Sequence, residues 1–458
     1  MPLSPVFRPL CSVLAAVALS ARAADQKPNI VLFVADDMGY ADCGPTGCKD
    51  IPTPNIDALA KNGVRFSNGY TSGCVCSPTR AGLISGRYQQ RFGFDANAEG
   101  KGKPGAERAP RALDIAQTTL PQRLKTLGYA TGAFGKWHLG ADEGYLPTQR
   151  GFDTFYGILP HGLGATGPDG KSPPPTYRGT AVTETPKNHM EAFCGEALAF
   201  VDQHCKEPFL LYLPFTAVHG PFVGPQPWLD RHDAAAPKGR RTYGADLRQM
   251  DDIIGRVMAR LRERGLEENT LVFFFSDNGG PGGAANNGPY RGAKWTLWEG
   301  GIHVPFIAQW KGRVPGGRVL DHPVIQVDVA ATALAAAGAE LSPGWKLDGA
   351  NLLPLLEGKT SAAPHEALYW RFGVQYAVRQ GDWKLVKPHI DQAPRLHNLA
   401  QDPGEQNDLA PQQPERVKQL QALWDAWNAD NEAPRWIDHR WNGDGAKPKK
   451  QAAKKQRL

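Results

Sequence analysis

Residues 29–37 read Asn-Ile-Val-Leu-Phe-Val-Ala-Asp-Asp, an apolar run that ends in two carboxylates. An apolar run of this length, rich in β-branched and aromatic side chains, is typical of a buried strand. We therefore predict a strand at Asn29–Ala35. Similar runs predict four more strands: Ala130–Phe134, Phe209–Phe215, Thr270–Phe275 and Val304–Trp310.

Helical patterns separate these runs. In residues 243–264 the apolar side chains recur every three or four positions: Leu247, Met250, Ile254, Val257, Met258 and Leu261. This spacing predicts a helix at Tyr243–Arg264, and a similar pattern predicts one at Glu191–Gln203. Strands that alternate with helices are typical of the α/β class. We therefore expect a central sheet, largely parallel or mixed, that is flanked by helices.

Four of the five predicted strands lead into polar residues. Asp36–Asp37 follow the first strand, Lys136 and His138 the second, His219 the third and Asp277–Asn278 the fourth. In open α/β sheets, ligands bind outside the carboxyl ends of the strands. If these strands are parallel, all four groups meet in one crevice.

The two acidic pairs are candidate metal ligands. Asp36–Asp37 and Asp277–Asn278 supply three carboxylates and one amide oxygen, which suit Ca²⁺ or Mg²⁺. Either pair alone is equally typical of helix capping or of a turn after a strand. Two such pairs at equivalent positions favour a metal site.

Cations and histidines accompany this acidic set. Arg80, Lys136 and Lys294, with His138 and His219, would suit a tetrahedral oxyanion ester, either a phosphate or a sulfate. Other histidines are predicted to be structural or to lie at the surface: His161, His232, His303, His389 and His397.

A cysteine-rich segment, Gly73-Cys74-Val75-Cys76-Ser77-Pro78-Thr79-Arg80, contains the third candidate element. Pro78 suits the first turn of a helix, which Thr79–Tyr88 would continue. Cys76 would then lie at a helix N-terminus, where negative charge is favoured. On position alone, a buried or disulfide-bonded cysteine remains the simpler interpretation.

The segment from Cys76 to Arg80, continued by Ala81-Gly82-Leu83-Ile84-Ser85-Gly86-Arg87, closely resembles the C-x-P-S/T-R signature of the formylglycine-dependent (type I) sulfatases. Thr79 stands where serine is common. The resemblance extends over most of the chain. Within the family, the sequence is similar to arylsulfatases and N-acetylgalactosamine-6-sulfatases. The other matching segments are Asn29–Gly39, Thr53–Ala60, Gly135–Gly140, Ser276–Gly279, Arg291–Lys294, Glu299–Gly301, Gly381–Leu385 and Asp402–Pro403.

The resemblance implies an alkaline-phosphatase-like α/β fold with a smaller C-terminal domain. It implies that a formylglycine-generating maturase oxidises Cys76 to formylglycine, which is hydrated to a geminal diol. The implied ligands of one Ca²⁺ are Asp36, Asp37, Asp277, Asn278 and the modified Cys76. The other implied roles are diol stabilisation by Arg80, sulfate binding by Lys136 and Lys294, general base catalysis by His138 and protonation of the leaving alcohol by His219.

The implied chemistry explains why a diol is required. One hydroxyl attacks sulfur, and His138 deprotonates the other so that the hemiacetal collapses and expels sulfate. A serine would form the ester but has no second hydroxyl. Cys74 is an extra thiol close to Cys76. A disulfide between them would block modification, but such a bond would be strained.

Three functions remain open at this point. The first is hydrolysis of a carbohydrate sulfate or an aryl sulfate. The second is a phosphatase or phosphonate monoester hydrolase of the same superfamily, which shares the metal pairs. The third is a non-catalytic binding protein, which should have lost site residues, whereas every expected residue is present here.

The ends of the chain account for its net charge of +6. The last twelve residues carry six lysines and arginines, and the first 23 carry two, so the remainder is nearly neutral. This charge distribution predicts no nucleic-acid-binding face. We expect residues 443–458 to form a basic disordered tail.

Residues 1–23 have the pattern of a signal peptide: Arg8, the apolar run Leu10–Leu19 and the small-residue site Ala21-Arg22-Ala23. No run is long enough for a membrane span. We therefore expect a periplasmic or secreted protein with no integral membrane segment in the mature chain. Export permits disulfides. Cys43 and Cys48 are close enough in sequence to pair, whereas Cys194 and Cys205 flank one helix and are too far apart.

A change of composition near Pro354–Pro364 predicts a linker, and we expect it to close a catalytic domain at 24–365. Beyond it, a hairpin of Tyr376–Arg379 and Trp383–Lys387 and an amphipathic helix at Glu415–Asn428 predict a small α+β domain at 366–442. Polar and aromatic candidates for the substrate entrance, where rings would suit sugars, are His161, Trp228, Tyr290, Trp295 and Trp298. Ordinary packing is the alternative for each of them.

Overall fold

The computed structural model describes residues 27–98, 111–160, 174–231 and 236–436. The predicted signal peptide at 1–23 and basic tail at 443–458 lie outside the described residues, as do His161 and His232.

A ten-stranded mixed sheet forms the centre of the molecule, in the order β11-β2-β10-β9-β1-β8-β4-β5-β6-β7. Its strands are β1 (Asn29–Ala35), β2 (Val64–Phe66), β4 (Ala130–Lys136), β5 (Thr154–Ile158), β6 (Thr176–Arg178), β7 (Ala181–Thr183), β8 (Phe209–Pro214), β9 (Thr270–Ser276), β10 (Phe306–Gln309) and β11 (Arg318–Leu320). The neighbours β9, β1, β8, β4 and β5 are all parallel. Their carboxyl ends therefore lie at the same edge of the sheet.

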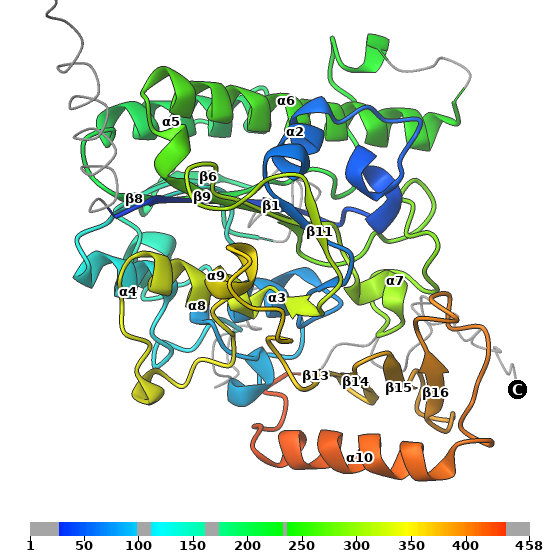
Figure 1. The fold of residues 1–458 in the computed structure, drawn as a ribbon. Coiled ribbons are helices and arrows are strands. Elements are labelled where there is room, and N and C mark those ends of the chain that lie inside the picture. Colours follow the sequence, from blue (N-terminus) through cyan, green and yellow to red (C-terminus); the bar gives the residue numbers. More distant parts are fainter. Residues whose placement is uncertain (1–26, 99–110, 161–173, 232–235, 437–458) are drawn as a thin grey trace, which may run out of the picture.

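Both faces of the sheet are covered by helices (Figure 1). Side chains of β1 alternate between two cores, with Ile30 and Leu32 in one and Val31 and Phe33 in the other. The helices of the first core are α3 (Cys76–Ser85), α4 (Leu120–Thr126), α8 (Val327–Ala336) and α9 (Leu353–Leu356). Those of the second are α2 (Pro54–Asn62), α5 (His189–Gln203) and α6 (Lys238–Glu263). Burial on both faces explains the nearly continuous apolar sequence of β1.

The two edges of this sheet are short. β11 and β7 each have three residues, and each carries one exposed valine, Val319 at 51% and Val182 at 63% exposure.

A four-stranded antiparallel sheet follows in the order β13-β14-β15-β16. Its strands are β13 (Leu368–Phe372), β14 (Gln375–Gln380), β15 (Trp383–Lys387) and β16 (Arg395–Asn398). Helix α10 (Pro414–Ala429) covers its outer face (Figure 1), burying Leu420 and Trp427. A two-stranded sheet pairs β3 (Gly69–Tyr70) with β12 (Val324–Ile325), and the short helix α7 (Glu299–Ile302) lies near the C-terminal sheet.

The predicted α/β fold, with a mixed sheet and a smaller C-terminal sheet, is confirmed. The strand at Val304–Trp310 forms as the shorter β10 and runs antiparallel to β9. The predicted linker is wrong at its start, because Leu355 and Leu356 of α9 are buried in the core. The domain boundary at residue 365 stays a prediction.

The described cysteines are all free thiols, so the structure contains no Cys43–Cys48 disulfide. Cys43 is buried in the core with its Sγ 3.1 Å from Thr46 Oγ1, whereas Cys48 donates to Asp50 near the surface. Within the described ranges, no helix has the length and apolar character needed to cross a membrane.

Candidate active site

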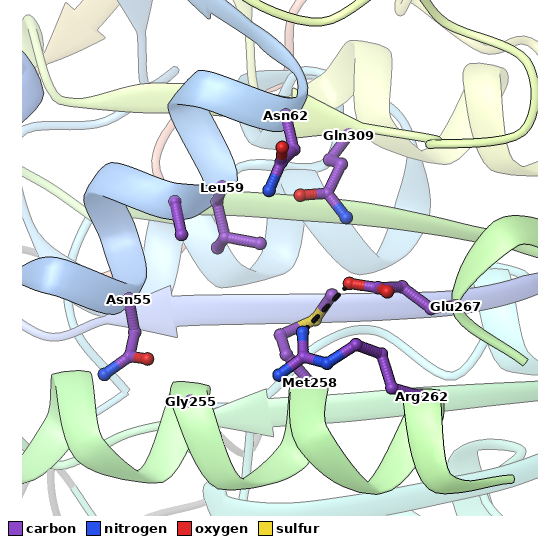
Figure 2. A pocket seen from close by; sticks show the side chains of 9 residues that line it. Asn55, Leu59, Asn62, Gly255, Met258, Arg262, Glu267 and Gln309 are labelled. Carbon is purple, nitrogen blue, oxygen red and sulfur yellow. Dashed lines mark hydrogen bonds and ion pairs between the residues drawn. The ribbon is translucent and has the colours of Figure 1, made fainter. Parts of the chain in front are cut away.

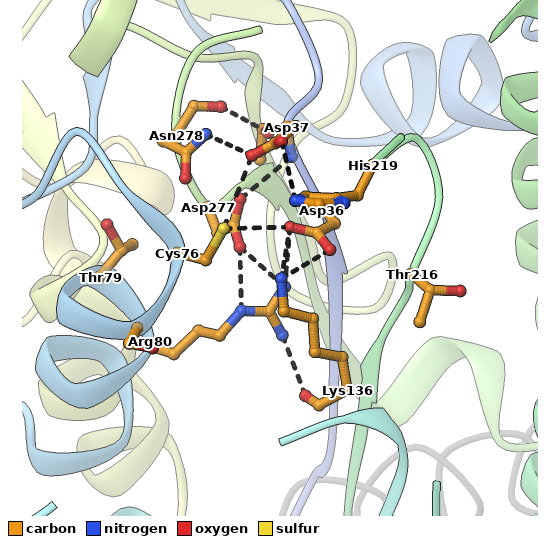
Figure 3. Close-up of polar contacts among 12 residues, drawn as sticks. Asp36, Asp37, Cys76, Thr79, Arg80, Lys136, Thr216, His219, Asp277 and Asn278 are labelled. Atoms are coloured by element: carbon orange, nitrogen blue, oxygen red, sulfur yellow. Dashed lines mark hydrogen bonds and ion pairs between the residues drawn. The ribbon is translucent and has the colours of Figure 1, made fainter. Parts of the chain in front are cut away.

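Four parallel strands bring the predicted polar groups together, as expected from their sequence positions. Asp36–Asp37 follow β1, Lys136 is the last residue of β4, His219 follows β8 and Asp277–Asn278 follow β9. Cys76 and Arg80 reach the same place from the first turns of α3, as Figure 3 shows. We call Asp36, Asp37, Cys76, Arg80, Lys136, Asp277, Asn278 and Lys294 the site cluster.

The acidic side chains of the site cluster converge tightly. Ligand atoms of Asp36, Asp37, Cys76 and Asp277 all lie within 4.8 Å of one another. Asp37 has a φ of 63°, and its backbone N–H donates to Asp277 Oδ1 at 3.1 Å. A positive φ at a non-glycine residue is uncommon and is found preferentially at functional sites.

Each carboxylate of the site cluster has its own cation, and Figure 3 shows Lys136 beside Asp36 and Arg80 beside Asp277. Lys136 Nζ lies 2.7 and 2.9 Å from the two oxygens of Asp36. Arg80 binds Asp277 Oδ2 through two nitrogens, at 2.7 and 2.9 Å. Lys294 Nζ donates to Asp37 Oδ2 at 2.7 Å. Three buried carboxylates are thus balanced by three buried cations.

The charges shift the protonation equilibria of the acids. Burial raises the pKa of Asp277 to about 6, with a further contribution from the charge of Asp36 that Arg80 opposes. Burial also acts on Asp37, but the charges of Lys294 and His219 outweigh it and hold the pKa of that carboxyl well below its usual range.

Cys76 is fully buried at the start of α3, in contact with acids and with a cation. Its Sγ lies 3.4 Å from Asp36 Oδ1, 3.6 Å from Asp37 Oδ1 and 3.4 Å from Lys294 Nζ. Burial, followed by the charge of Asp277, raises the pKa of the thiol well above 9. The unmodified thiol is therefore protonated at neutral pH and is a poor nucleophile, because the thiolate is the reactive form.

The start of α3 is held by hydrogen bonds that the sequence did not predict. Asn97 Oδ1 accepts the Ser77 backbone N–H at 3.1 Å, and Ser77 Oγ accepts the Ala98 N–H at 3.1 Å. Thr79 Oγ1 donates to the carbonyl of Gly73 at 3.1 Å. No local spacing links Asn97 to α3, since twenty residues separate it from Ser77.

The two candidate histidines differ in their described contacts. His219 Nε2 lies 3.5 Å from Asp37 Oδ2, and its Nδ1 lies 2.6 Å from the carbonyl of Gly220. A carbonyl only accepts, so Nδ1 bears the proton. Burial lowers the pKa of His219 to about 4, although Asp37 opposes this shift. His138 is 1% exposed with a φ of 61°, two residues beyond Lys136, and its catalytic role stays a prediction.

The site cluster suits a hard divalent cation. Asn278 Nδ2 donates to Asp37 Oδ1 at 2.8 Å and to the Gly279 carbonyl at 2.9 Å. Its Oδ1 is buried and accepts no hydrogen bond from any described residue. Such an acceptor costs about 1–3 kcal/mol when left unpaired. A cation bound by this oxygen and by three carboxylates would remove that cost, and an all-oxygen set is the type that Ca²⁺ prefers.

Of the candidates for the substrate entrance, Trp295 lies beside the site cluster. Its ring centroid is 5.3 Å from Lys294 Nζ. Trp298 is buried, with Arg291 stacked 4.0 Å from its ring centroid, and Tyr290 stacks on His303 at 4.2 Å. Packing is therefore the main role of Trp298 and Tyr290, and Trp228 is half-buried with no described contact to the site cluster.

A separate hollow lies between α2, α6 and β10 (Figure 2). It shares no residue with the site cluster. Its lining residues are Asn55, Ala58, Leu59, Asn62, Gly255, Met258, Arg262, Glu267 and Gln309.

A family model described as Sulfatase matches residues 28–339, which is more than half of the chain. The chain belongs to the sulfatase family. A second model, described as N-sulphoglucosamine sulphohydrolase, C-terminal, matches residues 293–428 of this sulfatase. The family resemblance seen in the motifs is thereby confirmed.

Curated relatives of this sulfatase are themselves named as sulfatases. Human N-acetylgalactosamine-6-sulfatase is 32% identical over 442 residues, covering 86% of this chain and 83% of the relative. The mouse protein of that name is 34% identical over 396 residues, covering 82% and 75%. Human arylsulfatase G is 31% identical over 418 residues, covering 80% and 77%. The chain is therefore an enzyme of sulfate ester hydrolysis.

Solved structures share the fold of the sulfatase. Ps i-CgsB superposes with a TM-score of 0.83 at 32% identity, covering 90% of this chain and 95% of that chain. The PsFucS1 sulfatase from Pseudoalteromonas sp. gives 0.78 at 26% identity, covering 93% and 95%. The phosphonate monoester hydrolase SpPMH from Silicibacter pomeroyi gives 0.68 at 17% identity, covering 90% and 98%, which is a likeness of fold alone.

Proposed function

We propose that this sulfatase removes sulfate from a sulfated carbohydrate, using one Ca²⁺ and a formylglycine made from Cys76. The observation that carries the proposal is the position of Cys76 Sγ, 3.4 Å from both Asp36 Oδ1 and Lys294 Nζ inside a buried, charge-balanced cluster. A protonated thiol is a poor nucleophile there. Oxidation of Cys76 to formylglycine would replace its sulfur with oxygen. An oxygen atom suits a position between carboxylates and an ammonium group.

The proposed Ca²⁺ ligands are Asp36, Asp37, Asp277, Asn278 and the modified Cys76. Support comes from the converging ligand atoms and from the buried Asn278 Oδ1 without a donor. When bound, the cation would act as a Lewis acid on a sulfuryl oxygen and would acidify the attacking hydroxyl.

The hydrate of formylglycine would supply two hydroxyls, one that attacks sulfur and a second whose deprotonation releases sulfate. Arg80 lies one helical turn beyond Cys76 on α3, where its guanidinium would stabilise this hydrate. Asp277 and the Lys136 carbonyl hold that guanidinium in place.

Two lysines bind the sulfuryl group in this proposal. An ammonium group has three N–H donors, so Lys294 can keep its bond to Asp37 and still donate to a sulfuryl oxygen. Lys136 does the same beside Asp36. Their positive charges offset the negative charge that develops on the sulfuryl oxygens in the transition state.

His219 and His138 carry protons in the two steps. The negative charge of a bound sulfate ester would raise the pKa of His219 and oppose the effect of burial. Protonated Nε2 would then donate to the oxygen of the leaving alcohol, while Nδ1 keeps its bond to Gly220. His138 would accept the proton of the second hydroxyl.

A carbohydrate substrate is favoured by the relatives and by one side chain. Ps i-CgsB has been solved with k-i-k-neocarrahexaose, and N-acetylgalactosamine-6-sulfatase is named for a sugar sulfate. In this chain the half-buried Trp295 beside Lys294 offers an aromatic face of the kind on which sugar rings stack.

We further propose that residues 1–23 direct export to the periplasm or the cell exterior. In this proposal residues 24–365 form the catalytic domain, 366–442 the small α+β domain and 443–458 the basic tail. The proposed partners are the sulfated glycan and a formylglycine-generating maturase, without a nucleic acid or an integral membrane segment.

Peptide mass spectrometry across Cys76 tests the modification. Enzyme produced with a maturase should contain formylglycine at this position, in proportion to its specific activity. Active enzyme with only unmodified thiol would contradict the proposal. Paired assays with a sulfate and a phosphate ester of one sugar alcohol test the substrate class, and a large preference for the phosphate would overturn it.

A further inference from the structure

Three sequence motifs that the proposed chemistry does not use meet in one buried group. Glu299 belongs to Glu-Gly-Gly at the start of α7, Lys384 lies in β15, and Glu405 follows Asp402-Pro403. Lys384 Nζ lies 2.8 Å from Glu299 Oε1 and 2.9 Å from Glu405 Oε1. Glu405 Oε2 accepts the Glu299 backbone N–H at 2.7 Å. We call Glu299, Lys384 and Glu405 the ion triad.

The ion triad is closed to solvent and fully paired at Glu299. Its three side chains are at most 2% exposed. Glu299 Oε2 accepts from Tyr70 Oη at 2.6 Å and lies 2.9 Å from His303 Nδ1. Removing one partner from such a group strands a buried charge, which the surroundings accommodate only by moving or by admitting water.

The ion triad is bonded to the loop that carries Lys294. Arg291 donates to the Glu405 carbonyl at 3.0 Å, so Glu405 contacts the loop at residue 291 and again at Glu299. Gln375 of β14 holds the middle of the loop. Its Oε1 accepts the Leu297 N–H at 3.2 Å and its Nε2 donates to the Trp295 carbonyl at 3.0 Å. The C-terminal sheet, together with Glu405 in the segment after β16, therefore contacts this loop at residues 291, 295, 297 and 299.

Close packing transmits the position of α7 to this loop. A Cβ on Gly300 would lie 2.4 Å from the Gly292 carbonyl oxygen, and one on Gly301 would lie 2.0 Å from the Thr296 carbonyl oxygen. Only glycines allow so close an approach of two backbones. A shift of Glu299 must therefore displace the residues on both sides of Lys294.

We propose that Lys384 and Glu405 are positioning residues: through Glu299 they fix the loop that places the Lys294 ammonium against Cys76 and Asp37. The C-terminal sheet thereby sets the affinity of the site for the sulfuryl group. The inference rests on the proposed role of Lys294 in binding sulfate. It gives the C-terminal sheet a function beyond completing the fold.

The test compares Lys384→Met with Leu420→Ala. Leu420 belongs to α10 and packs against Val378 and Leu385 on the outer face of the same sheet, so its truncation destabilises the sheet without touching the loop. We expect Lys384→Met to raise KM and the dissociation constant of inorganic sulfate by about tenfold to a hundredfold, the cost of a small misplacement. Leu420→Ala should leave both constants unchanged at temperatures well below its Tm. Sulfate binding is measured by calorimetry, independently of turnover.

A double-mutant cycle identifies the route of the effect. In a Lys294→Ala background, Lys384→Met should no longer weaken sulfate binding. In the wild-type background, Lys384→Arg should retain part of the sulfate affinity that Lys384→Met loses. If Lys384→Met does not fold, Glu405→Gln replaces it, since the amide oxygen still accepts the Glu299 N–H. Unchanged sulfate binding in these variants, or equal losses in Leu420→Ala, would overturn the inference. Wild-type enzyme without sulfatase activity would instead refute the proposed function.

Discussion

The site cluster and the ion triad are both buried and charge-balanced, yet they differ in how their potential ligand atoms are arranged. In the ion triad both oxygens of Glu299 have donors, from Lys384 on one side and Tyr70 on the other. In the site cluster the Asn278 Oδ1 has no donor among the described residues, and four potential ligand atoms lie within 4.8 Å. A buried ion pair by itself is therefore weak support for a catalytic site. Convergence of four potential ligand atoms is the stronger indication of a catalytic site.

Among the variants that distinguish the site cluster from the ion triad, Cys76→Ala should have the largest effect. We expect kcat/KM for a sulfate ester to fall on the order of 10⁴-fold, about 5.4 kcal/mol of transition-state stabilisation, because the proposed nucleophile is removed. The Tm should change little. Cys74→Ser is the matched control, a buried cysteine two residues away, and should keep most of the activity. Equal losses in both variants would argue against a special role for Cys76.

Lys384→Met, unlike Cys76→Ala, should cause a large loss of stability. Removing the cation strands Glu299 and Glu405, and we expect the free energy of unfolding to fall by about 3–5 kcal/mol. Lys136→Met, which strands Asp36 in the site cluster, should be partly rescued by Ca²⁺, whereas Lys384→Met should not. Urea unfolding with and without Ca²⁺ measures both effects. Rescue of both variants by Ca²⁺ would remove the distinction between the clusters.

The effect of Ca²⁺ on the free energy of unfolding should distinguish the site cluster from the ion triad by a smaller amount. At a hundredfold excess over its Kd, Ca²⁺ should raise the free energy of unfolding by about 2.7 kcal/mol. Asp277→Asn should abolish this increase and Glu299→Gln should preserve it. Thermal unfolding against Ca²⁺ concentration is the measurement, and an undiminished increase in Asp277→Asn would place the cation elsewhere.

The smallest effect concerns pH. Burial, together with the charge of Glu299 and against that of Lys384, raises the pKa of Glu405 from 4.5 to about 7. Between these values the folded chain holds a proton that the unfolded chain has lost, so this contribution to stability declines as pH rises, by about 1 kcal/mol per pH unit. Glu405→Gln should flatten the profile in that window. Urea unfolding from pH 5 to pH 7 tests this, and identical profiles would contradict it.

Local patterns were enough to predict the framework of the site. The apolar run at Asn29–Ala35 forms β1 with the predicted bounds. Burial of every residue on both faces of the sheet explains why the run is almost entirely apolar. Asp36–Asp37 and Asp277–Asn278 were predictable as neighbours, since parallel strands align their carboxyl ends. The family signature identified Cys76 as a candidate catalytic residue, whereas its position alone favoured a structural cysteine.

Long-range partners could not be predicted in the same way. Helix α6 begins at Lys238, not Tyr243, and its first residues show no apolar period. Arg240 anchors that turn to Asp42 and Asp50, nearly two hundred residues away. The ion triad has the same origin, because Glu299 and Lys384 are 85 residues apart. Their motifs were visible in the sequence, but the bonds that join them depend on the folded chain.

The three-residue edges of the large sheet have a consequence for the enzyme in concentrated solution. A long exposed edge presents a row of unpaired backbone groups onto which a second chain can add a strand. Ten strands side by side would make this hazard severe if β7 and β11 were as long as β1, which has seven residues. The three-residue edge strands leave few unpaired backbone groups onto which another chain could add a strand. A wide sheet can therefore remain colloidally stable.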